Sequence, residues 1–126
     1  MLDDNMNILI VDDTQSIRRI VKNVLKEIGF KNFEEAENGE DAYGKLQGGG
    51  FQFASVDWNM PVLTGIELVR KIKANDALQD VKILMLTAEA EKERVIEAIQ
   101  AGVDNYLIKP FTPESLEDKV NKIFRD

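Results

Sequence analysis

Reactive side chains stand at the ends of short apolar runs in this sequence. The residues at these positions are Asp12, Asp13, Asp57, Thr87 and Lys109. Three carboxylates brought together without histidine or cysteine form a hard oxygen-donor site, which suits Mg²⁺ or Mn²⁺ and not zinc or copper. Mg²⁺ seldom fills its octahedral shell from protein ligands alone, so such a site keeps positions for water and for a phosphoryl oxygen. Phosphoryl transfer is therefore the reaction that these residue types favour.

The same residue types suggest how that reaction would proceed. One of the aspartates can attack phosphorus and form an acyl phosphate. Crowded carboxylates raise one another's pKa, and a metal ion together with the ammonium of Lys109 would offset that cost. Both cations would also neutralise the charge on the phosphoryl oxygens in the transition state, and Thr87 could donate a hydrogen bond to one of them.

Each of these features also has a purely structural interpretation. Two aspartates after a strand often form only a turn that places negative charge at a helix N-terminus. Thr87 could merely finish a strand, and Lys109-Pro110 could be an ordinary turn. Compatible chemistry at several separate strand ends is hard to obtain by chance, so the combination favours a functional site.

Alternating apolar runs and helix-like segments predict the architecture that would assemble this site. The expected strands are 7–11, a weak 32–36, 51–56, 81–86 and 105–108. Their alternation with helices predicts an α/β fold, a doubly wound parallel sheet of five strands with five helices. Ligand sites in such sheets lie beyond the carboxyl ends of the strands, where the reactive residues fall.

The helices are predicted from apolar spacing and from their end signals. The second and third helices span about 38–47 and 64–74, the fourth ends before Gly102, and the fifth opens with Thr112 as N-cap and Pro113. The side chains expected to face inward are Ile17, Ile20, Val21, Val24, Leu25 and Ile28 in the first helix, Ile66, Val69 and Ile72 in the third, Val95, Ile96 and Ile99 in the fourth, and Leu116, Val120, Ile123 and Phe124 in the fifth.

Composition limits the remaining possibilities. The 126 residues, 44% of them hydrophobic, predict one domain over 1–126 without an output domain. The absence of cysteine and histidine removes thiol and imidazole chemistry. A formal charge of −7 argues against nucleic-acid binding, and no segment looks like a signal peptide or a membrane span, so we expect a cytoplasmic protein.

Four motifs give the chain a resemblance to a known family. They are Val11-Asp12-Asp13, Asp57-Trp58-Asn59-Met60-Pro61, Thr87-Ala88 and Lys109-Pro110-Phe111. Together they resemble the receiver domain of the two-component response regulators over nearly the whole chain. Further segments resemble the chemotaxis regulators of that family: Arg18-Arg19, Glu35-Ala36-Glu37, Thr87-Ala88-Glu89-Ala90, Tyr106 and Lys109-Pro110-Phe111-Thr112. The resemblance implies a flavodoxin-like sheet with strand order 2-1-3-4-5.

The resemblance also implies roles for the reactive residues. Asp57 would accept a phosphoryl group from a chemotaxis histidine kinase. One Mg²⁺ per chain would bind Asp13, Asp57 and the backbone carbonyl of Asn59, with Asp12 acting mainly through water. Such a protein is a phosphoacceptor switch and not a conventional enzyme, since it catalyses only its own phosphoryl transfer and dephosphorylation.

Further implied roles concern the response to phosphorylation. Thr87 and Lys109 would sense the phosphoryl group, and the aromatic ring of Tyr106 would rotate inward as the threonine moves. A buried tyrosine can equally be plain core packing. Asn59 and Glu89 would tune the access of the hydrolytic water, although either side chain could simply be solvated.

A partner surface on the fourth helix, fifth strand and fifth helix is implied as well. Its residues would be Ala90, Lys92, Tyr106, Ile108, Phe111 and Lys119. The surface would receive a short helix of the flagellar motor switch and part of the kinase, and a phosphatase is a further candidate partner. The chain departs from the family pattern at Glu91, at Thr14-Gln15-Ser16-Ile17 and at Val62-Leu63-Thr64, which bears on the output and not on phosphorylation.

Three alternatives to a motor-binding switch remain at the level of sequence. A lone receiver could act as a phosphate sink or signal to a partner other than the motor. A flavin carrier of the same architecture would need a loop of small hydroxyl and glycine residues where acids follow the first strand. A hydrolase with a DxD nucleophile would need a second aspartate where Asn59 stands. We expect a monomer as the simplest state.

Overall fold

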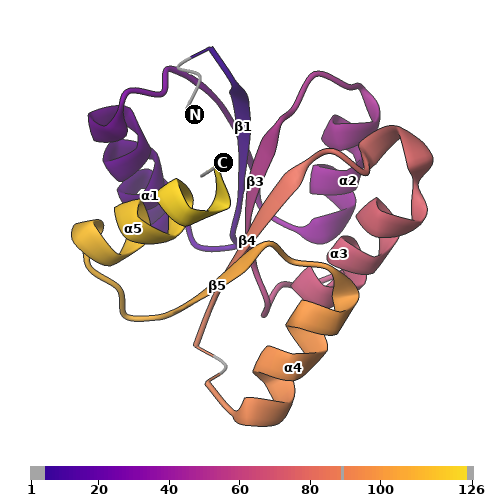
Figure 1. Ribbon diagram of the computed structural model, residues 1–126. Helices are drawn as coiled ribbons and strands as arrows, with labels where there is room; N and C mark the ends of the chain where they lie inside the picture. Colours follow the sequence, from indigo (N-terminus) through magenta and orange to yellow (C-terminus); the bar gives the residue numbers. More distant parts are fainter. Residues whose placement is uncertain (1–4, 89, 125–126) are drawn as a thin grey trace.

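A five-stranded parallel sheet forms the centre of the protein. The computed structural model describes residues 5–88 and 90–124. The strands are β1 (Asn7–Val11), β2 (Asn32–Ala36), β3 (Phe53–Asp57), β4 (Lys82–Thr87) and β5 (Asn105–Ile108). Their spatial order is β2-β1-β3-β4-β5 (Figure 1). The predicted fold class and strand order are confirmed.

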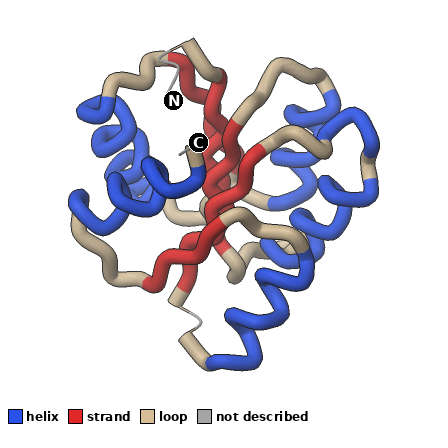
Figure 2. Tube along the Cα trace, in the orientation of Figure 1, coloured by secondary structure: helices blue, strands red, loops and turns tan. Residues whose placement is uncertain are grey.

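Helices cover both faces of this sheet, as Figure 2 shows. The helices are α1 (Gln15–Ile28), α2 (Gly39–Gln47), α3 (Gly65–Ala74), α4 (Lys92–Ala101) and α5 (Pro113–Ile123), with a short 3₁₀ turn at Asp76–Leu78. Side chains of α1 and α5 share one apolar core with the sheet, and those of α2, α3 and α4 share the other. Because helices bury both faces of the sheet, most residues of the central strands are apolar, and the alternation of apolar and polar residues seen in half-exposed strands is absent from them.

Local signals fix where several helices begin. Thr64 accepts a hydrogen bond from the amide of Glu67, and the Glu67 side chain accepts one from the Thr64 amide, which makes a capping box at the start of α3. Thr112 and Ser115 form the same arrangement at α5, where Pro113 opens the helix as predicted. The cap at Thr64 therefore fixes the point at which the loop after β3 ends and α3 begins.

Some sequence predictions of burial are wrong. Ile20 on α1 is 48% exposed, and Ile96 and Ile99 on α4 are 42% and 59% exposed. Helix α4 instead faces the sheet with Ala98, which is fully buried, and with the half-buried Val95. A small residue at the contact lets the helix lie close to the sheet without needing a wide apolar stripe, so the isoleucines beside it remain in solvent.

Strand boundaries differ slightly from the prediction. Strand β3 begins at Phe53, two residues later than expected, because Phe51 and Gln52 belong to the loop that follows α2. Asp57 and Thr87 are the last residues of their strands, and not the first residues after them. Both side chains therefore have positions set directly by the sheet. No helix within the described parts of the chain is long and apolar enough to span a membrane.

Candidate functional site

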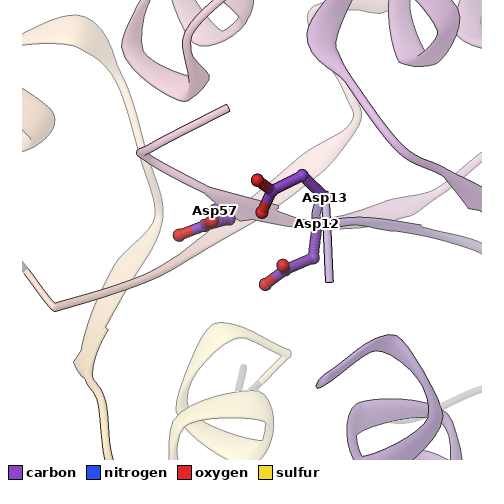
Figure 3. A group of neighbouring side chains, drawn as sticks. All are labelled: Asp12, Asp13 and Asp57. Carbon is purple, nitrogen blue, oxygen red and sulfur yellow. The ribbon is translucent and has the colours of Figure 1, made fainter. Parts of the chain in front are cut away.

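Three carboxylates meet at the carboxyl edge of the two neighbouring central strands β1 and β3. One ligand oxygen each from Asp12, Asp13 and Asp57 lies within 4.8 Å of the others (Figure 3). Asp12 and Asp57 are buried, whereas Asp13 is exposed to solvent. This cluster, called the acid pocket below, thus joins two shielded carboxylates to one that solvent reaches.

Lys109, which follows β5, completes the electrostatics of this pocket. Its Nζ donates to Oδ2 of Asp12 at 2.9 Å and lies 3.3 Å from Oδ1 of Asp57. Burial alone would lower the pKa of Lys109, but the hydrogen bond to Asp12 and the attraction of both carboxylates outweigh burial and raise it. The ammonium therefore stays charged at every physiological pH.

The protein groups alone leave excess negative charge in the pocket. Burial, followed by repulsion from Asp12, raises the pKa of Asp57 to about 6, although Lys109 pulls it down. By count, one lysine faces three carboxylates, so their charges do not balance. A divalent cation would supply the missing positive charge, and an all-oxygen donor set beside solvent is typical of a Mg²⁺ site.

The two carboxylates of the loop after β1, Asp12 and Asp13, are held differently. Oδ1 of Asp12 accepts from the amide of Thr14 at 2.9 Å, and its Oδ2 accepts from Lys109. Oδ1 of Asp13 accepts only a long hydrogen bond, 3.4 Å, from the Thr14 hydroxyl. Asp13 and Asp57 therefore retain more capacity for direct coordination, whereas the engaged oxygens of Asp12 suit contact with a metal through water.

Thr87 and Tyr106 lie on the same face of the sheet. Met85 is paired in register with Tyr106 on β5, and Thr87 lies two residues farther along β4, so all three side chains point the same way. Thr87 is fully buried and Tyr106 is 9% exposed. Both belong to the side of the sheet that α4 covers, which connects the pocket edge to that helix.

The remaining predicted site residues have varied exposure. Asn59 is exposed in the loop after β3, and Glu89 lies outside the described residues. Of the predicted partner surface, Ala90 and Lys92 are exposed, and Ile108, Phe111 and Lys119 are half-buried, while Tyr106 is buried in this conformation. Strand β5 packs between α4 and α5, so these residues belong to one continuous region.

Two residues important to the pocket have no assigned role in the sequence interpretation. Gly65 opens α3 so close to β3 that a Cβ atom there would overlap the backbone carbonyl of Asp57. Arg18 on α1 donates to the backbone carbonyl of Asp12. The glycine after the Pro61 segment was a visible signal for close backbone approach. Nothing in the local pattern distinguishes Arg18 from its neighbour Arg19.

An open parallel sheet that gathers three carboxylates and a lysine at its carboxyl edge defines a phosphoryl-accepting regulatory domain. The family model of the response regulator receiver domain matches residues 8–121, and the chain belongs to this family. It is accordingly a phosphoacceptor switch and not a conventional enzyme.

Chemotaxis proteins are among its similar relatives. The chain is 50% identical over 124 residues to chemotaxis protein CheY-3 of Vibrio cholerae, which covers 98% of this chain and 95% of that protein. It is also 50% identical over 119 residues to chemotaxis protein CheY of Pseudomonas aeruginosa, covering 94% and 96%. The likeness is therefore to the CheY-like chemotaxis members of the family.

Solved structures agree with this assignment. The structure of Vibrio cholerae CheY4 superposes with a TM-score of 0.87 at 35% identity, covering 95% of this chain and 99% of that one. A CheX–CheY complex with BeF3 and Mg from Borrelia burgdorferi gives a TM-score of 0.90 at 23% identity, covering 96% and 90%, and supports the fold alone.

Proposed function

We propose that this protein is a single-domain chemotaxis response regulator that is phosphorylated on Asp57 and then binds the flagellar motor switch. The arrangement of Asp57 carries the proposal: its carboxylate lies at the end of the central strand β3, 3.3 Å from Lys109 and beside two further carboxylates. The other two acids begin the segment after β1. Asp57 is therefore the carboxylate of the cluster that a strand itself holds, with Lys109 and two further acids beside it.

Phosphorylation is a displacement at phosphorus. A carboxylate oxygen of Asp57 forms a bond to the phosphorus of a phosphohistidine, the P–N bond breaks, and the imidazole leaves with a proton from solvent. Bound Mg²⁺ would neutralise charge on the transferring group, held by Asp13, Asp57 and the carbonyl of Asn59, with Asp12 through water. Lys109, whose ammonium lies 2.9 Å from Asp12 and 3.3 Å from Asp57, would stabilise the same charge.

Hydrolysis of the acyl phosphate returns the protein to its resting state. Water attacks phosphorus, and the Asp57 carboxylate leaves together with its bonding electrons. We assign the control of that water to Asn59 and Glu89, which are two residues beyond Asp57 and Thr87. The exposure of Asn59 beside an open pocket supports this role.

The switch is proposed to run through Thr87 and Tyr106. When the hydroxyl of Thr87 moves to a phosphoryl oxygen, it leaves space on the face of the sheet that it shares with Tyr106. The Tyr106 ring, which is already buried, then repacks into that space, and this changes the surface beside α4. The shared orientation of the two side chains supports this coupling, because a residue on the opposite face could not respond to the vacated volume.

The output surface consists of α4, β5 and α5. Ala90, Lys92, Ile108, Phe111 and Lys119 would receive a helix of the motor switch, and the kinase would dock on the same region. Exposed Ile99 adds apolar area to α4. We place the protein in the cytoplasm as a monomer, where both partners reach it; a phosphatase is a third partner of this proposal.

A phosphate sink is the second candidate function. Glu91, at the N-cap of α4, is exposed and adds negative charge at the edge of the proposed motor surface. An acidic partner helix would be repelled there, although one exposed charge changes affinity by only about 1 kcal/mol or less. A sink would keep the phosphorylation chemistry and lack the motor contact.

A peptide titration separates the two functions. A fluorescently labelled N-terminal peptide of the motor switch protein is titrated with this protein in Mg²⁺, with and without beryllofluoride, and with Asp57→Asn as the control. Trp58, the sole tryptophan, reports occupation of the pocket by its fluorescence. Tighter peptide binding that requires Asp57 supports the motor function. A Trp58 response without tighter binding favours the sink.

A further inference from the structure

Arg18 is a nearly buried cation that joins three elements near the pocket. Its side chain is 13% exposed although it belongs to the solvent-covered helix α1. Nε donates to Oε1 of Glu35 on β2 at 2.8 Å, and Nη1 donates to the backbone carbonyl of Asp12. The planar guanidinium is suited to two such bonds at once, whereas an ammonium is not.

The bond to Asp12 completes the fixation of that residue. The Asp12 amide donates to the carbonyl of Ala36 at 3.1 Å, and its two carboxylate oxygens accept from Thr14 and Lys109. With Arg18 on the carbonyl oxygen, every polar atom of Asp12 has a partner. A residue held at all four atoms has little freedom to shift when a ligand enters or leaves.

The carbonyl that Arg18 binds belongs to the peptide group joining Asp12 to Asp13. Fixing this group therefore fixes the direction in which the backbone presents Asp13. That matters because Asp13 is exposed and the hydrogen bond to its own carboxylate is 3.4 Å long. Its position thus depends on its backbone, which Arg18 helps to hold through the Asp12 carbonyl.

Glu35 forms an ion pair with Arg18, whose positive charge lies near a pocket proposed to bind a cation. An unpaired guanidinium would repel a divalent ion, and Coulomb repulsion between such charges is long-ranged at low ionic strength. Glu35 forms an ion pair with Arg18 at 2.8 Å and a longer one with Lys22 at 3.8 Å, so it offsets part of the Arg18 charge beside the pocket. Lys45 donates to the backbone carbonyl of Glu35 and thereby helps to hold this part of β2 in place.

We propose that Arg18 is a positioning residue for metal binding, which orients the Asp12–Asp13 peptide group while Glu35 offsets part of its charge. The inference rests on the proposed Mg²⁺-dependent function and adds to it a structural support outside the pocket. Groups that orient metal ligands in this way typically change affinity by about 10- to 100-fold when they are removed.

Mg²⁺ titration of full-length variants tests this role, with Trp58 fluorescence and calorimetry as independent readouts. The variants are Arg18→Met, Arg18→Lys and Glu35→Gln, and Arg19→Met is the matched control, since Arg19 is the adjacent exposed arginine on the same helix. Circular dichroism and urea unfolding establish that each variant is folded. Phosphorylation by phosphoramidate provides a second measurement.

The expected effect of Arg18→Met is an increase in the Mg²⁺ dissociation constant of about tenfold, with Arg19→Met close to wild type. A charge effect alone has the opposite sign, because removing a cation would tighten Mg²⁺ binding. Arg18→Lys keeps the charge but cannot make both bonds, so its affinity should lie between those of wild type and Arg18→Met. Glu35→Gln should weaken binding most at low salt, where the Arg18 charge that Glu35 no longer offsets is least screened.

Several results would overturn the proposal. Affinities for Arg18→Met within twofold of Arg19→Met, or tighter than wild type, exclude a positioning role. If Arg18→Met does not fold, the test rests on Arg18→Lys. A Mg²⁺ affinity of Arg18→Lys equal to that of wild type would then exclude the positioning role. Failure of the wild-type protein itself to bind Mg²⁺ would contradict the proposed function instead, so the two failures are distinguishable.

Discussion

The acid pocket and helix α4 differ in how tightly their side chains are constrained. In the pocket, Asp12 has a partner at every polar atom and Lys109 bridges two carboxylates. On α4, Ile96 and Ile99 lie in solvent, and Ala98 is the fully buried residue of the helix. The chemical site is thus rigid, while the neighbouring surface has apolar area available for a partner.

This contrast is the one expected of a switch. The phosphoryl-accepting groups must be preorganised, because small displacements of reacting groups are costly. The responding element must be able to move, and elements with few buried apolar contacts are the ones that do so at low cost. The predictions below test the two halves of this comparison.

Changing Gly65 to Ala should have the largest effect on stability. A Cβ atom at this position overlaps the carbonyl of Asp57, so α3 or β3 must shift. We expect the free energy of unfolding to fall by about 3 kcal/mol, the upper range for overpacking. Urea denaturation measures the change. Gly44→Ala is the control, because its Cβ meets nothing within 4 Å inside α2, and it should stabilise by up to about 1 kcal/mol.

The pH dependence of stability without metal should come next. The folded-state pKa of Asp57 is about 6, above its ordinary value of 3.8. The unfolded chain therefore binds fewer protons than the folded one between these values, and Asp57 destabilises the fold at neutral pH. Lowering the pH through 6 toward 4 should relieve up to about 3 kcal/mol of that cost.

Thermal unfolding in the presence of a chelator, repeated across this pH range, measures the gain in stability. Asp57→Asn should remove the dependence and be the more stable protein at pH 7. Saturating Mg²⁺ should stabilise wild type at pH 7 in proportion to its affinity, and should do so much less in Asp57→Asn. A metal-free wild type that loses stability between pH 7 and pH 5 would contradict a raised pKa of the buried Asp57 carboxyl.

These results bear on what the sequence could predict. The strand order was implied by family resemblance, and the convergence of Asp12, Asp57 and Lys109 followed from strand ends meeting at one sheet edge. The prediction that Ile96 and Ile99 of α4 are buried was wrong. Apolar spacing marks a possible inward face of a helix, but it does not show that the small residue Ala98 makes the close contact with the sheet. Arg18-Arg19 belongs to the segments that resemble the family, but the sequence assigns Arg18 no role because its partner Glu35 is 17 residues away.

Backbone strain at Val62 offers a smaller test on the pocket side. This β-branched residue has φ of 72° in the loop between β3 and α3 and is 73% exposed. Asparagine tolerates the left-handed region better than valine does. Val62→Asn should therefore stabilise the fold by about 1 kcal/mol, as measured by urea denaturation. Val62→Thr keeps the branched Cβ and should give no comparable gain.

The smallest effect on stability is expected on α4, with Ile99→Ser. Because Ile99 is already 59% exposed, the free energy of unfolding should change by less than about 0.5 kcal/mol. The same substitution should weaken binding of the motor-switch peptide in beryllofluoride, since it removes apolar area from the surface proposed to receive it. Lys31→Ser, an exposed change on the loop before β2, is the control. A clear loss of stability in Ile99→Ser would mean that Ile99 is held in the fold, and the contrast between a rigid pocket and an available α4 surface would fail.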